Sequence, residues 1–197
     1  MKIIVAAIPG SGKTTVLQYV KKKIPNVKIV SEGDLVFALA ARKFKIKNRD
    51  ELRKKLSLPQ QRLIQATVAK KIGLMKDRIL LIDSHFSIKT PEGYLPGLPE
   101  SSMRAINPDV IVLLEFHPVD ILKRRKRDKN RKRDMETIRE IHEHQKINHE
   151  FVIAAAAQVQ AAVEIIEFRR KQIIPYSHAW FAARKIVKII KKMKKLG

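Results

Sequence analysis

Five short runs of apolar residues recur along the chain, and the segments between them have the periodicity of helices. The runs span residues 3–8, 27–30, 79–82, 110–114 and 163–168, and turn residues bound them. Parallel strands need long crossover connections, and strands that are apolar along their length need two buried faces. The pattern therefore predicts an α/β fold with a central five-stranded parallel sheet flanked by helices.

Two helical segments interrupt this alternation, and we expect them to be insertions into one domain of residues 1–197. The first spans residues 34–75, where Asp34 is a candidate cap for the helix in LVFALAARKF, Asn48 opens a second helix and Pro59 starts a third. The second spans residues 124–145, from a basic run into a long helix. The apolar second half of that helix, FVIAAAAQVQAA, is predicted to pack on the core.

The C-terminal pattern AWFAARKIVKIIKKMKK is amphipathic and basic. We expect a closing helix packed on the sheet, with Trp180 and Phe181 in the core. A membrane-bound or RNA-binding helix is the alternative that the same pattern leaves open.

The charge balance adds an expectation about partners. Lys and Arg number 42 against 19 Asp and Glu, which gives a formal net charge of +23. Such a field attracts polyanions, so nucleotides or RNA are the expected partners. The chain has no cysteine, which excludes a disulfide framework and a thiolate zinc site. No apolar run approaches the roughly 20 residues that span a bilayer, so we expect a cytoplasmic protein without a membrane partner.

A glycine-rich stretch, AAIPGSGKTT, follows the first apolar run and leads directly into a helix pattern. Strand, loop and helix in this order are typical of a phosphate-binding loop, in which backbone amides and a lysine surround phosphates and a hydroxyl reaches Mg²⁺. An ordinary glycine-rich turn is the alternative. The predicted ATP-binding residues are Ala7, Ile8, Pro9, Gly10, Ser11, Gly12, Lys13, Thr14 and Thr15. Ala7 replaces the first glycine of the usual pattern, which is tolerable if its φ is negative.

Two acidic residues end predicted strands. Asp83 follows the third run, at the edge where open α/β sheets place their ligands, and is predicted to hold Mg²⁺ through water together with Thr14. A solvated strand-end aspartate is the alternative. Glu115 ends the fourth run and either shares this role or pairs with nearby cations.

The basic run KRRKRDKNRKR is either a solvated face, an RNA-binding patch or a lid whose arginines neutralise a transferred phosphoryl group. We select Arg124, Arg125, Arg131 and Arg133, together with Lys13, as catalytic candidates. His142 and His144 are two residues apart, so on a helix they face different directions and are not expected to share a metal ion.

These motifs together resemble the archaeal type of adenylate kinase, within the P-loop nucleoside-monophosphate kinases. The most specific stretch is DSHFSIKTPEGYLPGLP, and the matches also include Gly33-Asp34, NRDELRKK, the basic run and HEHQKIN. The resemblance implies Mg²⁺-dependent transfer of the ATP γ-phosphate to AMP, with residues 34–75 as the NMP-binding insertion and residues 124–145 as the lid. It also implies that the AMP side holds Gly33, Asp34, Arg53, His85, Lys89 and Thr90.

The archaeal type is often trimeric, so the resemblance further implies a homo-oligomer. RNA binding in addition to the kinase activity stays possible but is not required. The chain departs from the family pattern in two places. His149 stands where the family has an arginine, and EFRRKQIIPYSHAW replaces an Asn- and Gly-containing loop beside the donor base. An RNA-associated P-loop ATPase and a kinase for another nucleoside monophosphate are the alternative functions.

Overall fold

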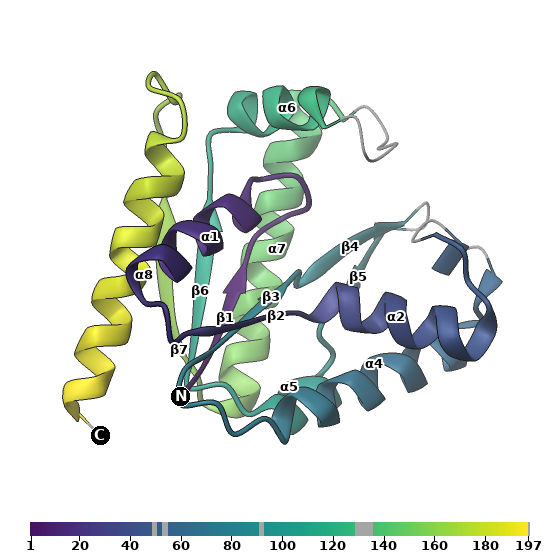
Figure 1. The fold of residues 1–197 in the computed structure, drawn as a ribbon. Helices are drawn as coiled ribbons and strands as arrows, with labels where there is room; N and C mark the ends of the chain where they lie inside the picture. Colours follow the sequence, from purple (N-terminus) through teal and green to yellow (C-terminus); the bar gives the residue numbers. More distant parts are fainter. Residues whose placement is uncertain (49–50, 53–54, 91–92, 129–135, 197) are drawn as a thin grey trace.

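In the computed structural model, five parallel strands form one sheet at the centre of the molecule (Figure 1). The structure describes residues 1–48, 51–52, 55–90, 93–128 and 136–196. The strand order is β2–β3–β1–β6–β7, with bounds β1 Lys2–Ala6, β2 Lys28–Ser31, β3 Leu80–Ser84, β6 Val110–Glu115 and β7 Ala162–Glu167. The predicted α/β class and five-stranded parallel sheet are confirmed, because each apolar run contributes one strand.

Helices cover both faces of the sheet, and alternate residues of β1 face each set. Ile3 and Val5 pack in the cluster that includes α1 (Lys13–Lys23) and α8 (Ser177–Leu196). Ile4 and Ala6 pack in the opposite cluster, formed with α2 (Glu32–Phe44), α4 (Leu58–Gly73), α5 (Glu100–Ile106) and α7 (Ile138–Val159). The remaining long helix, α6 (Pro118–Arg127), follows β6 and lies near the phosphate-loop end of the sheet (Figure 1).

The helix starts differ from the sequence predictions in one respect. Ser31, and not Asp34, caps α2, because its hydroxyl directly after β2 accepts a hydrogen bond from the amide of Asp34 at 3.2 Å. Asp34 lies in the first turn, where its charge favours the helix dipole. The start predicted at Pro59 holds to within one residue, since α4 begins at Leu58.

A two-stranded hairpin within residues 87–96 was not anticipated. Strand β4 (Ser87–Thr90) pairs antiparallel with β5 (Gly93–Pro96), so that Lys89 lies opposite Tyr94. In Figure 1 this hairpin lies above α2. Strand β4 of the hairpin contacts α7. The hairpin therefore directs the segment that follows Asp83 toward that helix.

The C-terminal helix packs on the sheet as expected, but the placement of Trp180 and Phe181 in the core is wrong. Ala182, Ile186 and Ile190 are buried, whereas Trp180 and Phe181 are 41% and 49% exposed. With 3.6 residues per turn, the two aromatic residues fall outside the buried stripe. None of the helices within the described residues has the length and apolar character needed to cross a membrane.

Gly73 permits α4 to approach α5 closely. A Cβ atom at Gly73 would lie 2.0 Å from the carbonyl oxygen of Ala105, so the backbone itself would have to move. We expect Gly73→Ala to lower the free energy of unfolding by about 2 kcal/mol. The clash with the backbone should cost about 3 kcal/mol, and the better helix propensity of alanine should recover about 1 kcal/mol.

Urea unfolding measures this change. Leu74→Ala is the control, since Leu74 is 78% exposed and a surface substitution changes stability by no more than about 0.5 kcal/mol. Equal stability of Gly73→Ala and the native protein would contradict the close approach of the two helices.

Candidate active site

The loop between β1 and α1 has the backbone conformation that a phosphate-binding loop needs. Gly10 and Gly12 adopt φ values of 80° and 95°, a region that favours glycine. Ala7 is fully buried and its φ is not positive, so its methyl group is accommodated. Helix geometry gives the amides of Lys13 and Thr14 no intrahelical acceptor, so these two are available to phosphate oxygens. The amide of Thr15 donates instead to the carbonyl oxygen of Gly12 at 3.1 Å.

Lys13 connects the loop to the carboxyl end of β3. Its Nζ lies 2.6 Å from Oδ1 of Asp83 and also donates to the carbonyl oxygen of Ser84. The side chain is only 5% exposed. Burial lowers the pKa of Lys13, while the charge of Asp83 acts in the opposite direction. The neighbouring strand order brings these two groups together, because β3 pairs directly with β1.

His85 links the residue after β3 to the start of the loop. Its Nδ1 lies 2.5 Å from the carbonyl oxygen of Ala7 and 3.4 Å from Nζ of Lys13. Since a carbonyl oxygen only accepts and an ammonium only donates, the shorter contact assigns the proton to Nδ1. Residue 7 therefore contributes its carbonyl group to the site.

Two arginines of α6 reach the phosphate loop. Arg124 donates to the carbonyl oxygen of Ser11 and, at 2.9 Å, to Oε1 of Gln172, while its guanidinium lies 4.6 Å from the ring centre of Phe116. Arg125 donates to the carbonyl oxygen of Pro9 from two nitrogens, at 2.8 and 3.0 Å. Burial lowers the pKa of Arg124, and Asp120 opposes that effect. An arginine stays charged despite such a shift.

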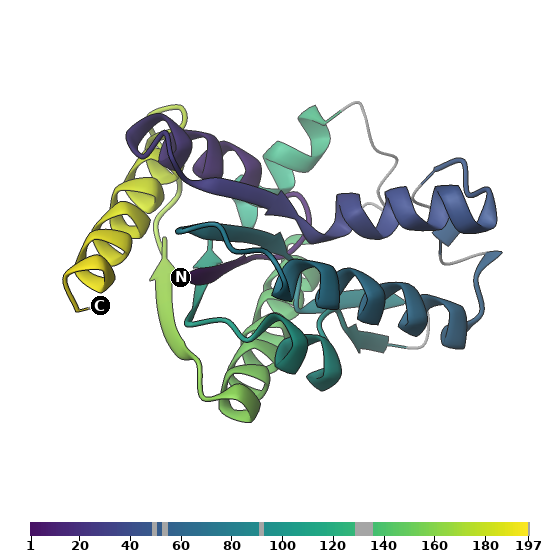
Figure 2. The ribbon, with the colours of Figure 1, turned by 60° about the horizontal axis from the view of Figure 1, so that its bottom comes forward.

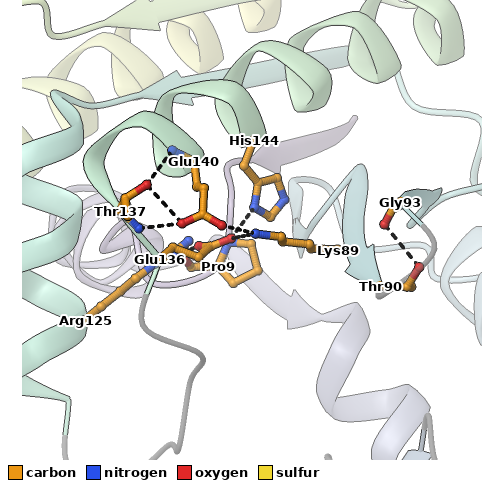
Figure 3. Close-up of polar contacts among 9 residues, drawn as sticks. All are labelled: Pro9, Lys89, Thr90, Gly93, Arg125, Glu136, Thr137, Glu140 and His144. Atoms are coloured by element: carbon orange, nitrogen blue, oxygen red, sulfur yellow. Dashed lines mark hydrogen bonds and ion pairs between the residues drawn. The ribbon is translucent and has the colours of Figure 1, made fainter.

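Carboxylates at the start of α7 neutralise two of the candidate cations. Figure 3 shows Glu136 between Arg125 and Lys89, with His144 beside it. Lys89 lies 3.3 Å from Glu136 and 3.1 Å from Glu140. The side chains of Arg125 and Glu136 are 8% and 9% exposed. This cluster ties α6, α7 and the β4–β5 hairpin to the loop at Pro9.

A cavity of about 1100 Å³ lies along the phosphate loop. The predicted site residues that line it are Ile8, Gly10, Ser11, Gly12, Lys13, Thr14, Thr15, Gly33, Asp34, Asp83, His85 and Arg124. Residues of α2 and of the loop thus share one space with the end of β3. The loop and Asp34, from the predicted first insertion, therefore meet in the same cavity.

Other predicted residues have different surroundings. Lys89 and Thr90 lie in the hairpin, where Thr90 donates to the carbonyl oxygen of Gly93 at 3.1 Å. Arg53, Arg131 and Arg133 fall outside the described residues, so their predicted roles stay predictions. His142 is exposed, whereas His144 is buried and packs 5.0 Å from the ring of Tyr94.

The substituted position His149 contacts the other strand-end acid. Its Nδ1 lies 3.1 Å from Oε1 of Glu115, on β6. Glu115 therefore contacts a histidine, which is a cation only when protonated, and its expected pairing with nearby cations stays a prediction.

Sequence reasoning missed several residues that line the cavity. They are Leu17, Gln18, Ile29, Ser31, Phe116, Asp120, Lys123, Arg127, Asp128, Gln172, Ile173, Pro175, Tyr176 and Ala179. Phe116 follows β6 directly, at the same sheet edge as Asp83, so the strand-end rule could have found it. Residues 172–176 carry no strand-end signal, and only the family resemblance pointed to their segment, EFRRKQIIPYSHAW, as lying beside the donor base. Their position depends on tertiary contacts, such as the 2.7 Å hydrogen bond that the backbone amide of Gln172 donates to Oδ2 of Asp120.

The comparisons with known proteins agree with this geometry. The family model described as an AAA domain matches residues 6–142. An adenylate kinase of Pyrobaculum aerophilum is 44% identical over 191 residues, which are 96% of this chain and 96% of that protein. An adenylate kinase of Thermoplasma acidophilum is 43% identical and covers 84% of this chain and 88% of its own length.

Solved structures share the fold at low sequence identity. A shikimate kinase from Acinetobacter baumannii in complex with shikimate has a TM-score of 0.66 at 17% identity, over 98% of this chain and 94% of that one. A shikimate kinase from Bacteroides thetaiotaomicron has a TM-score of 0.60 at 16% identity, over 97% and 98%. The sheet, the phosphate loop and these likenesses define a P-loop kinase fold.

Within that class, identity over nearly the whole length decides the family. The chain belongs to the adenylate kinase family of phosphotransferases, and its archaeal relatives confirm the resemblance drawn from the sequence motifs.

The contacts of Glu140 in this carboxylate cluster make the free energy of unfolding depend on pH. The amide of Thr137, followed by the ammonium of Lys89, lowers the pKa of Glu140 from 4.5 to about 2. A lowered folded-state pKa stabilises the fold above the unfolded value, and that contribution is lost as the pH falls. We expect the native protein to be more stable than Glu140→Gln at pH 6, with the difference shrinking between pH 4.5 and about 2.

Urea unfolding across this pH range measures the difference. Glu143→Gln, an exposed position on the same helix, controls for the removal of one carboxylate. An identical pH dependence in both variants would remove the assigned role of Lys89 and Thr137.

Proposed function

We propose that this protein reversibly transfers the γ-phosphate of ATP to AMP and so forms two ADP. The observation that carries the proposal is the convergence of Lys13 and Arg124 on the phosphate loop, in a cavity that Gly33 and Asp34 also line. The relatives named adenylate kinase, which match nearly the whole chain, support the same reaction.

On the donor side, the loop from Ala7 to Thr15 would hold the ATP phosphates. Gly10 and Gly12 allow the amides to turn inward, and the N-terminus of α1 adds positive potential. Lys13 would exchange part of its contact with Asp83 for phosphate oxygens. Arg124 and Arg125 already donate to loop carbonyl groups, so they are close to where transferred charge would develop.

The residues at the cavity suit Mg²⁺. Thr14 offers a hydroxyl and Asp83 a carboxylate, both of which are hard oxygen ligands, and both residues line the cavity. Because Mg²⁺ keeps several waters and binds substrate phosphates, two protein groups suffice. When bound, the ion would neutralise charge on the phosphates.

On the acceptor side, the proposal assigns AMP to Gly33, Asp34, Arg53, His85, Lys89 and Thr90. Gly33, Asp34 and His85 line the cavity, and Lys89 belongs to the adjoining carboxylate cluster. The acceptor is already an anionic phosphate and needs no general base. Positioning and charge neutralisation by Lys13, Arg124, Arg125, Arg131 and Arg133 would then provide the rate acceleration.

Residues 34–75 and 124–145 would serve as the NMP-binding insertion and the lid. Arg124 and Arg125 belong to the last turns of α6, so this lid would begin on a helix anchored beside the loop. A homo-oligomer, such as a trimer, and a cytoplasmic location are further predictions of the family resemblance.

Lys13→Ala tests the proposal directly. We expect ADP formation from ATP and AMP to fall at least about 100-fold, because a preorganised charge at the transferred group is lost. A coupled assay measures the rate, and Lys22→Ala on the exposed side of the same helix is the control. Undiminished ADP formation in Lys13→Ala, with the fold intact, would sink the assignment.

The substrate assay separates the alternatives. We expect AMP to be phosphorylated in preference to CMP, UMP and GMP, and we expect activity to disappear with a chelator and return with Mg²⁺. Preference for another monophosphate would reassign the acceptor. ATP hydrolysis without AMP phosphorylation, stimulated by RNA, would favour an RNA-associated ATPase.

A further inference from the structure

The outward side of α8 carries two aromatic rings followed by cations. Trp180 and Phe181 are 41% and 49% exposed, with ring centres 5.0 Å apart. The exposed residues of the following turns include Arg184, Lys185, Lys188, Lys191 and Lys192. We call these seven residues the α8 face. At 1.5 Å per residue, the distance from Trp180 to Lys192 along the helix is about 18 Å.

No acidic residue of α8 or α1 offsets these charges. The two helices pack against each other, and neither sequence contains Asp or Glu. Both views place α8 at the rim of the molecule, with α1 beside it (Figure 1, Figure 2). The acidic residue that precedes α8 most closely in sequence, Glu167, is paired with Arg169 at 2.8 Å. The α8 face therefore presents an uncompensated positive surface within a chain of net charge +23.

We propose that the α8 face binds single-stranded RNA. Proteins that bind single strands combine aromatic rings, on which bases stack, with a row of cations along the phosphate backbone. Trp180 and Phe181 would provide the stacking surface, and the four lysines would contact the phosphates. The guanidinium of Arg184 lies 4.7 Å from the ring centre of Trp180 and extends that planar surface. This surface is separate from the nucleotide cavity, so the inference does not rest on the proposed phosphotransfer.

The packing of α8 disfavours a membrane as the partner. An interfacial helix inserts its apolar stripe among lipids. Here Ala182, Ile186 and Ile190 are buried in the core and cannot be inserted without unfolding the helix from the sheet. A two-fold contact with a second copy of the chain is disfavoured by charge, because it would oppose lysines with lysines. A polyanion with stackable bases matches both the rings and the charges.

Trp180 supplies a direct probe, because it is the single tryptophan of the chain. We expect its fluorescence to be quenched by a 20-nucleotide oligouridine RNA while excess Mg-ATP occupies the nucleotide cavity. The affinity should fall steeply as the salt concentration rises. Absence of quenching by this RNA at low salt would overturn the proposal.

A matched pair of variants localises the charge effect. Substituting Lys185, Lys188, Lys191 and Lys192 by Gln removes four charges from the α8 face. Substituting Lys70, Lys71, Lys76 and Arg78 by Gln removes four exposed charges elsewhere. On single strands, each phosphate contact contributes about 0.7 to the slope of log K against log salt. Loss of four contacts should therefore reduce this slope by about 3 in the first variant. The control should change it little, and equal losses in both variants would mean diffuse attraction and overturn the proposal.

A labelled RNA measures the contribution of the rings. We expect Trp180→Ala and Phe181→Ala each to weaken RNA binding between roughly 5- and 150-fold. Trp180→Phe, which keeps an aromatic ring, should retain most of the affinity of the native protein. Phosphotransferase activity should be unchanged in these variants, since neither ring lines the nucleotide cavity.

Competing partners are tested with the same variants. Binding to vesicles of phosphatidylserine and phosphatidylcholine without binding to RNA would assign the face to a membrane. Affinity for poly-glutamate equal to that for RNA would assign it to acidic proteins. A loss of oligomers in Trp180→Ala, with RNA binding intact, would assign it to a self-contact. Each of these results contradicts the proposal.

Discussion

The position of β1 between β3 and β6 is the constraint on which the candidate site depends. Because all three strands are parallel, their carboxyl ends meet at one edge of the sheet. That edge receives the phosphate loop from β1, Asp83 from β3 and Phe116 from β6. The apolar residues of these strands are buried on both faces of the sheet, so the sheet that forms the hydrophobic core also brings the polar groups together.

Charge pairing organises the groups at that edge. Lys13 and Asp83 form a buried pair, and Glu136 lies between Arg125 and Lys89. Buried charges are costly unless paired, so the pairings hold Lys13 and Arg125, which are 5% and 8% exposed, in defined places. In contrast, α1 and α8 carry basic residues and contain no acid. The large net positive charge is thus unevenly distributed, and it is partly compensated at the site and uncompensated along α8.

Much of the fold could be predicted from the sequence, since the five strands, the phosphate loop and the family motifs all have local signatures. Arg124 and Arg125, selected from the sequence as catalytic candidates, both contact the loop, and their catalytic role stays a prediction. No periodic pattern marks the hairpin around Lys89 or the loop at Gln172, so the conformation of neither could be predicted, although the family resemblance pointed to the Gln172 segment. For Trp180 a prediction was made and was wrong. It was placed in the core because it is aromatic, and its angular position on the amphipathic helix was not considered.

The sequence by itself determined the parallel α/β sheet, the phosphate loop and the family, because each depends on the order of residues along a short segment. Tertiary structure decided which cations reach the loop, which carboxylates hold them and which side of α8 faces outward. Those outcomes depend on contacts between residues far apart in the chain, such as Arg124 with Ser11 and Lys89 with Glu140. Packing geometry selects such contacts, and no local pattern encodes them.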